Sequence, residues 1–121
     1  MKYKKTIEHI DKHMNDLLKD LQTLIKQPSI SAKNEGIEEC AVLVAKMLKK
    51  AGISSEILRL NKTAAPLVFG EIKSKSNPSK TLLFYNHYDV QPIEPLGEWN
   101  DPPFSGKIIG NKIFGRGASD D

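Results

Sequence analysis

The sequence predicts an α/β fold, because two amphipathic helical patterns come first and strand patterns follow them. A continuous apolar run at residues 81–86 adds a strand covered on both faces, as in the middle of an α/β sheet. A two-residue turn signal inside residues 107–114 adds a β-hairpin. We therefore expect two helices, a mixed sheet and a hairpin in one layered domain.

The first helical pattern covers residues 6–26 and ends before Pro28, which cannot continue a helix. The second covers residues 36–50, and Gly52 is well placed to end it in a left-handed conformation. The QPSIS sequence between the two helices is predicted to be a loop. The apolar positions of the first pattern recur at three- and four-residue steps and are Ile7, Ile10, Met14, Leu17, Leu18, Leu21, Leu24 and Ile25.

Residues 53–60 are predicted to form a strand, and residues 67–73 form a second strand pattern in which apolar and polar side chains alternate. The polar stretch at residues 74–80 contains an Asn-Pro pair and is predicted to be a turn or loop. Apolar triplets within residues 107–114 flank a central Gly-Asn pair, which is the turn of the predicted hairpin.

The composition is that of a soluble globular protein, with 39% apolar and 27% charged residues among 121. The net charge of +3 comes from dispersed lysines without a nucleic-acid reader motif, so no nucleic-acid partner is expected. There is no secretory signal or bilayer-spanning apolar stretch, which predicts a cytoplasmic protein without a membrane partner. Cys40 is the single cysteine, so no internal disulfide can form.

A His-x-Asp pair, His87 and Asp89, directly follows the predicted strand at residues 81–86. Ligands gather at the carboxyl ends of strands in open α/β sheets. Alternate residues of a strand point the same way, so the imidazole and the carboxylate would be neighbours. A metal-bound histidine usually donates its other ring N–H to such a carboxylate. For this pair alone, a hydrogen-bonded histidine without a metal is the commoner alternative.

The sequence GRGASDD at residues 115–121 combines two glycines with an acidic end. The glycines permit a tight turn with positive φ, and the turn delivers Asp120 after the hairpin. A carboxylate suits a divalent cation and can bridge two of them. The alternative is an ordinary glycine turn with a solvated end. His9 and His13 also lie one helical turn apart, but no acidic or cysteine partner is evident, so they are expected to be surface residues.

Taken together, the chain resembles a family of zinc-dependent exopeptidases and deacylases. The resemblance rests on HYDVQP, Trp99, the DPPF sequence at residues 101–104 and GRGASDD, and the preceding elements fall in the expected order. The family includes carnosinase, cytosolic non-specific dipeptidase, glutamate carboxypeptidase, succinyl-diaminopimelate desuccinylase and acetylornithine deacetylase. The resemblance implies that residues 1–121 are the N-terminal portion of a three-layer catalytic domain.

The resemblance also implies roles for three residues. His87 matches a zinc ligand, Asp89 matches the acid that orients this histidine, and Asp120 matches the carboxylate that bridges two metal ions. Asp121 follows the bridging position. Two zinc ions are implied, although manganese or cobalt would accept the same nitrogen and oxygen ligands.

The implied activity is metal-dependent hydrolysis of the amide bond in dipeptides or similar small substrates. Gln91 and Pro92 are more typical of the dipeptidase branch than of the deacylases. The resemblance places the general-base glutamate, further ligands and a dimerising lid domain after Asp120, so this chain alone is expected to be inactive and the full-length enzyme a homodimer. The alternatives are an N-acyl amino acid deacylase of the same family, a non-catalytic remnant or binding module, and an unrelated α/β domain with a chance motif.

Overall fold

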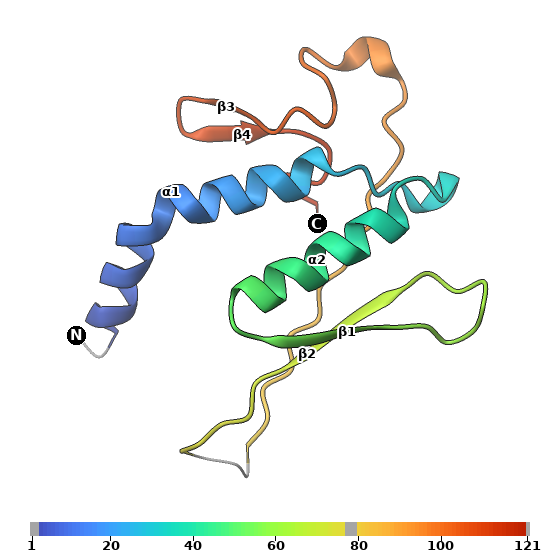
Figure 1. The fold of residues 1–121 in the computed structure, drawn as a ribbon. Coiled ribbons are helices and arrows are strands. Elements are labelled where there is room, and N and C mark those ends of the chain that lie inside the picture. The colour runs from blue at the N-terminus through green and yellow to red at the C-terminus, as the bar shows by residue number, and fades with distance from the viewer. Residues whose placement is uncertain (1–2, 77–79, 121) are drawn as a thin grey trace.

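The structure is a computed structural model that describes residues 3–76 and 80–120. It confirms the α/β class, both helices and the hairpin (Figure 1). Part of the polar segment at 74–80, including Asn77 and Pro78, and the last acid, Asp121, lie outside the described residues. The elements in chain order are α1 (Lys4–Lys26), η1 (Ser31–Lys33), α2 (Ile37–Lys50), β1 (Ser54–Leu58), β2 (Leu67–Glu71), η2 (Leu96–Glu98), β3 (Lys107–Ile109) and β4 (Lys112–Phe114).

The two helices end where the sequence predicts. α1 stops at Lys26, and Gln27 is extended with ψ 111°, as expected for a residue that precedes a proline. α2 is followed by Gly52 at φ 81°, and the Ile53 N–H donates to the Leu48 carbonyl oxygen at 2.9 Å. These features form a glycine-terminated helix end that satisfies the last carbonyl groups.

β1 and β2 form an antiparallel pair in which Ser54 faces Glu71 and Leu58 faces Leu67. α2 packs across this pair. Gly70 lies under the helix: a Cβ placed on it would lie 3.3 Å from the Leu48 side chain. A glycine at this position therefore allows close contact between the helix and β2.

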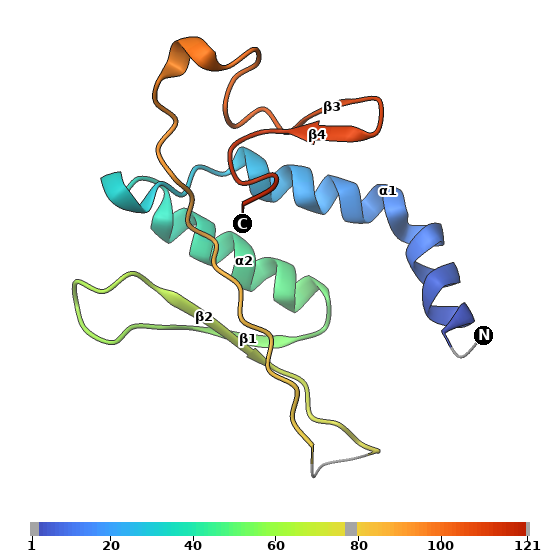
Figure 2. The same ribbon diagram turned by 180° about the vertical axis from the view of Figure 1, so that it is seen from behind.

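β3 and β4 form the second antiparallel pair, which lies beside the C-terminal part of α1 in both views (Figures 1 and 2). Gly110 has φ 58° at the first turn position, as two-residue hairpins of this type require. The Gln22 side chain of α1 donates to the Gly106 carbonyl oxygen at 2.7 Å. This hydrogen bond ties the start of the hairpin to the first helix.

The core is small and lies where α1 ends, the QPSIS loop turns and α2 begins. Ile30 is completely buried at the centre of this region, and Ser29 is 2% exposed. The buried apolar residues of the described chain are Ile25, Ile30, Ile37, Cys40, Ala41 and Ala45. The core is therefore formed mainly by the first half of α2 together with Ser29 and Ile30 of the loop.

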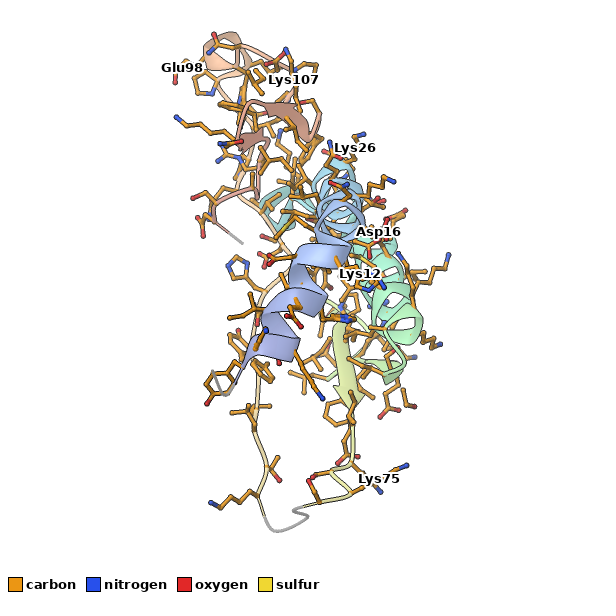
Figure 3. All side chains as sticks on the ribbon, turned by 90° about the vertical axis from the view of Figure 1, so that its left-hand side faces the viewer. Lys12, Asp16, Lys26, Lys75, Glu98 and Lys107 are labelled. Atoms are coloured by element: carbon orange, nitrogen blue, oxygen red, sulfur yellow. The ribbon has the colours of Figure 1, made fainter. Side chains whose placement is uncertain are left out.

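The prediction of a buried strand at residues 81–86 is wrong for the described structure. The segment forms no strand, and Leu82 to Tyr85 are 77–86% exposed. A buried strand needs hydrogen-bonded neighbours and a covering layer, but β1 pairs with β2 and β3 with β4. The side view shows the segment separated from β1 and β2 (Figure 3).

The expected mixed sheet is also absent from residues 3–76 and 80–120, because both strand pairs are antiparallel. Within these ranges, the parallel pairing is a single bridge between Ile30 and Val90. The first helix leaves its apolar stripe partly uncovered, since Ile7, Ile10, Met14, Leu17 and Leu21 are 37–49% exposed. No helix in the described chain has the length and apolar character needed to cross a membrane.

Candidate metal centre

The side chains of His87 and Asp89 are neighbours, as the sequence predicts. Nδ1 of His87 lies 2.9 Å from the main-chain oxygen of Asp89 and 3.3 Å from its Oδ1. Both oxygens accept hydrogen bonds, so this geometry favours the tautomer with the proton on Nδ1. In that tautomer a metal ion would bind Nε2. Both side chains are about half exposed, which leaves the pair accessible to an ion.

The His87–Asp89 segment is anchored to the loop between the two helices. Ser29 Oγ donates to the Tyr88 carbonyl oxygen at 2.7 Å, and the Val90 N–H donates to the Ser29 carbonyl oxygen at 2.8 Å. The Ile30–Val90 bridge continues this contact. The position of the pair is therefore set by the buried loop, whereas the sequence predicts a strand end.

Tyr88, between the two candidate site residues, makes a second anchor. Its hydroxyl donates to the carbonyl oxygen of Pro66, just before β2, at 2.6 Å. Burial is the largest cause of the raised pKa of the Tyr88 hydroxyl. Tyr88 therefore remains a neutral donor at neutral pH and ties the segment to the start of β2.

The turn before Asp120 packs against the same segment. Gly117 has φ 85°, and a Cβ placed on it would lie 2.9 Å from Cγ1 of Val90. Nη2 of Arg116 donates to the Pro92 carbonyl oxygen at 2.9 Å, and its guanidinium lies 5.0 Å from the centre of the Trp99 ring. These contacts bring the two predicted motifs together.

Asp120 itself is exposed at the end of the described chain. An imidazole nitrogen and a carboxylate oxygen are suitable zinc ligands, so the chemistry of His87 and Asp120 fits the implied metal. Among the residues that the structure describes, no group of three or more histidine, cysteine or acidic side chains is placed to hold a metal ion. His87 and Asp120 would therefore form only part of a ligand set.

Sequence reasoning missed the supporting residues. The QPSIS sequence predicts a loop but no role for Ser29, and the burial of Ile30 beside it is known only from the structure. The GRGASDD sequence predicts only that Arg116 lies in a glycine-rich turn. Its contacts with Pro92 and Trp99 join segments that are distant in the sequence, and no local pattern predicts such contacts.

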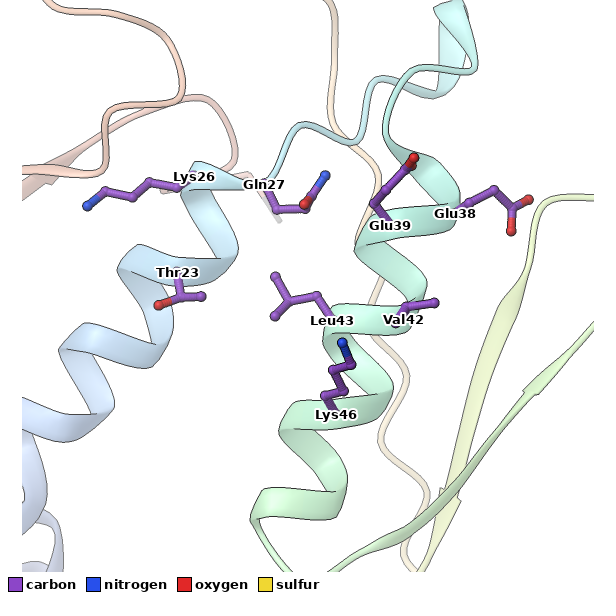
Figure 4. Close-up of a pocket in the computed structure, with 8 residues that line it drawn as sticks. All are labelled: Thr23, Lys26, Gln27, Glu38, Glu39, Val42, Leu43 and Lys46. Atoms are coloured by element: carbon purple, nitrogen blue, oxygen red, sulfur yellow. The ribbon is translucent and has the colours of Figure 1, made fainter.

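A separate open groove of about 620 Å³ lies between α1 and α2 (Figure 4). Its lining residues are Thr23, Lys26, Gln27, Glu38, Glu39, Val42, Leu43 and Lys46. None of them belongs to the His87 or Asp120 motif. Charges of both signs surround it, and Glu38 forms an ion pair with Arg59. The groove is therefore distinct from the candidate metal centre.

Comparisons with known proteins show which family the chain is similar to. The family Peptidase M20/M25/M40 matches residues 83–121, which include both motifs. A solved M20 family metallo-carboxypeptidase from Sulfolobus solfataricus is 44% identical and superposes with a TM-score of 0.71, over 82% of this chain and 23% of that one. The chain belongs to this family of peptidases.

A desuccinylase is also similar to this chain in sequence. Succinyl-diaminopimelate desuccinylase of Blochmanniella pennsylvanica (strain BPEN) is 38% identical over 100 residues, which are 82% of this chain and 25% of the relative. The chain therefore spans about a quarter of the length of the relatives it matches.

Proposed function

We propose that this chain is the N-terminal part of the catalytic domain of a metal-dependent hydrolase that cleaves the amide bond of dipeptides or similar small substrates. The observation that carries the proposal is the packing of Gly117 against Val90, because it joins the His87 motif to the turn that bears Asp120. The family relationship supports the same chemistry.

In the proposed mechanism, His87 would hold a metal ion through Nε2, and Asp89 would keep the proton on Nδ1. The carboxylate of Asp89 strengthens the imidazole as a ligand and fixes its orientation. The carboxylate of Asp120 would supply a further oxygen ligand. The chemistry that zinc, manganese or cobalt would supply there is polarisation of the substrate carbonyl and a lowered pKa of a bound water.

The general base is proposed to lie outside this chain. Glu94 and Glu98 are the two glutamates that follow the His87 motif, and both are exposed. Glu94 forms an ion pair with Lys33, so its carboxylate is not suited to proton transfer at the metal centre. We propose that residues downstream of Asp120 complete the site and that the isolated chain is inactive.

Two classes of substrate are candidates for this chemistry. Gln91 and Pro92 favour the dipeptidase branch, and dipeptides are our first choice. The second candidate, an N-acylated amino acid, is favoured by the similarity to a desuccinylase. Both classes present an amide bond to the same hydrolytic chemistry, so the metal centre alone does not separate them.

The test begins by sequencing the coding DNA that follows the codon for Asp121. The product of the whole reading frame is then assayed with zinc on a panel of dipeptides and N-succinyl amino acids. We expect dipeptide hydrolysis that His87→Ala lowers at least 100-fold, as loss of a metal ligand would cause. His9→Ala is the matched control, since His9 is an exposed histidine of α1. Hydrolysis unaffected by His87→Ala would contradict the proposal.

A further inference from the structure

We propose that Ser29 is a positioning residue of the metal centre, which it serves by holding both peptide groups that flank Asp89. The inference rests on the proposed function, since Asp89 in turn holds His87. Ser29 lies 58 positions before His87 in the sequence, and the fold brings the loop that contains it against the motif.

Ser29 makes a hydrogen bond to each of these two peptide groups. Ser29 Oγ donates to the carbonyl oxygen of Tyr88, which belongs to the peptide group before Asp89. The carbonyl oxygen of Ser29 accepts the Val90 N–H, which belongs to the peptide group after Asp89. Because both peptide planes are fixed, the backbone angles of Asp89 between them are fixed as well.

The backbone of Asp89 determines where its acceptors lie. Its main-chain oxygen is 2.9 Å from Nδ1 of His87, and its carboxylate oxygen is 3.3 Å away. Rotation of either peptide group would move both acceptors relative to the ring. Fixing Asp89 therefore fixes the tautomer and orientation of the imidazole that is proposed to bind the metal.

Burial of Ser29 holds its two hydrogen bonds to the Asp89 segment in place. Ser29 is 2% exposed and follows Pro28, and Ile30 beside it is completely buried. His87 and Asp89 are by contrast about half exposed. Without the Ser29 hydroxyl, the Tyr88 carbonyl would retain the Cys40 thiol as a donor, at 3.9 Å, and a thiol is a weak donor. The hydroxyl is thus the stronger of the two side-chain donors that link the core to the peptide group before Asp89.

The experiment compares Ser29→Ala, Ser29→Thr, Ser55→Ala and His87→Ala in the complete protein that carries this chain. Ser55 is the matched control, because its hydroxyl also donates to a main-chain oxygen, that of Ala45, at 2.9 Å. Zinc affinity is measured by titration calorimetry, and hydrogen exchange of the Val90 amide is measured by NMR. Neither readout depends on turnover.

We expect Ser29→Ala to lower zinc affinity about 10-fold, the lower end of effects seen for residues behind a metal ligand. Ser29→Ala should also accelerate hydrogen exchange of the Val90 amide. Ser55→Ala should change neither zinc affinity nor this exchange rate. Ser29→Thr retains the hydroxyl and should bind zinc more tightly than Ser29→Ala. A purely space-filling role predicts the reverse order, because the extra methyl group crowds a buried site.

Wild-type zinc affinity in folded Ser29→Ala, together with weakened binding in His87→Ala, would overturn the role of Ser29 alone. Unchanged zinc affinity in His87→Ala would instead overturn the proposed metal centre. If Ser29→Ala does not fold, Ser29→Thr carries the test: binding close to wild type supports the tie, and a 10-fold loss in a folded variant contradicts it.

Discussion

A Cβ atom placed on Gly117 would lie 2.9 Å from Cγ1 of Val90, closer than side-chain atoms normally approach. The glycine turn before Asp120 therefore packs directly on the residue after Asp89. This contact joins two motifs that are separated by the η2 loop and the β3–β4 hairpin. The candidate metal centre depends on it, because the two motifs supply different ligands.

Gly117→Ala is expected to disrupt this contact. The alanine would have to adopt φ 85° and displace Val90, which together should destabilise the protein by about 2–4 kcal/mol. Zinc affinity should fall as well, because Asp120 would move away from His87. Urea unfolding and zinc titration measure the two effects.

Gly110→Ala is the control for backbone strain. Gly110 also has positive φ, 58°, but nothing lies within 4 Å of a Cβ placed there. It should show a smaller loss of stability, about 1 kcal/mol, and unchanged zinc affinity. Equal effects of the two substitutions would show that the contact with Val90 is unimportant.

Arg116→Met should also weaken the connection between the motifs. Methionine has a similar length but can neither donate to the Pro92 carbonyl nor form a cation–π contact with Trp99. We expect a loss of about 1–2 kcal/mol in the free energy of unfolding. Arg59→Met is the comparison, since Arg59 forms an exposed ion pair with Glu38 and such pairs contribute little. A loss at Arg59 as large as that at Arg116 would contradict this account.

The Lys33–Glu94 ion pair predicts a pH effect. The hydrogen bond from Lys33 is the largest cause of the lowered pKa of Glu94. A lowered pKa in the folded state means that the stabilisation is present above the unfolded-state pKa and is lost as pH falls through the folded-state pKa. Lys33→Met should return the pKa of Glu94 towards its ordinary value, as measured by carbon NMR titration of the carboxyl group. The effect on stability should be small, because the pair is about half exposed.

The exposed run from Leu82 to Tyr85 predicts self-association of the isolated 121-residue chain. Contiguous exposed apolar side chains on a segment that forms no strand are a typical aggregation site. Phe84→Asp should reduce association in sedimentation velocity experiments. Leu96→Asp is the control, because Leu96 is 60% exposed but lies outside this run. Association that is insensitive to Phe84→Asp would exclude the run as its cause.

Local patterns in the sequence were sufficient for the two helices and the β3–β4 hairpin. Pro28 and Gly52 end the helices where steric and hydrogen-bond rules require, and the Gly-Asn pair sets the β3–β4 turn. The neighbouring positions of His87 and Asp89 were also predictable, because they follow from the two-residue spacing in extended backbone.

Non-local contacts were not predictable in the same way. The apolar run at residues 81–86 has the composition of a central strand, but composition does not supply the neighbouring strands that a sheet needs. The ties from Ser29 to Tyr88 and from Arg116 to Pro92 connect residues 59 and 24 positions apart. Such contacts depend on how the chain folds back on itself, and a single sequence contains no periodic signal for them.

The central claim is that His87 and Asp120 bind a common metal centre. It is tested most directly by anomalous diffraction at the zinc edge from crystals of the complete protein grown with zinc. The account predicts zinc at about 2.0–2.2 Å from both Nε2 of His87 and a carboxylate oxygen of Asp120, either on one ion or on two ions within about 4 Å. Zinc bound elsewhere, with the His87 and Asp120 side chains both outside its coordination sphere, would contradict it.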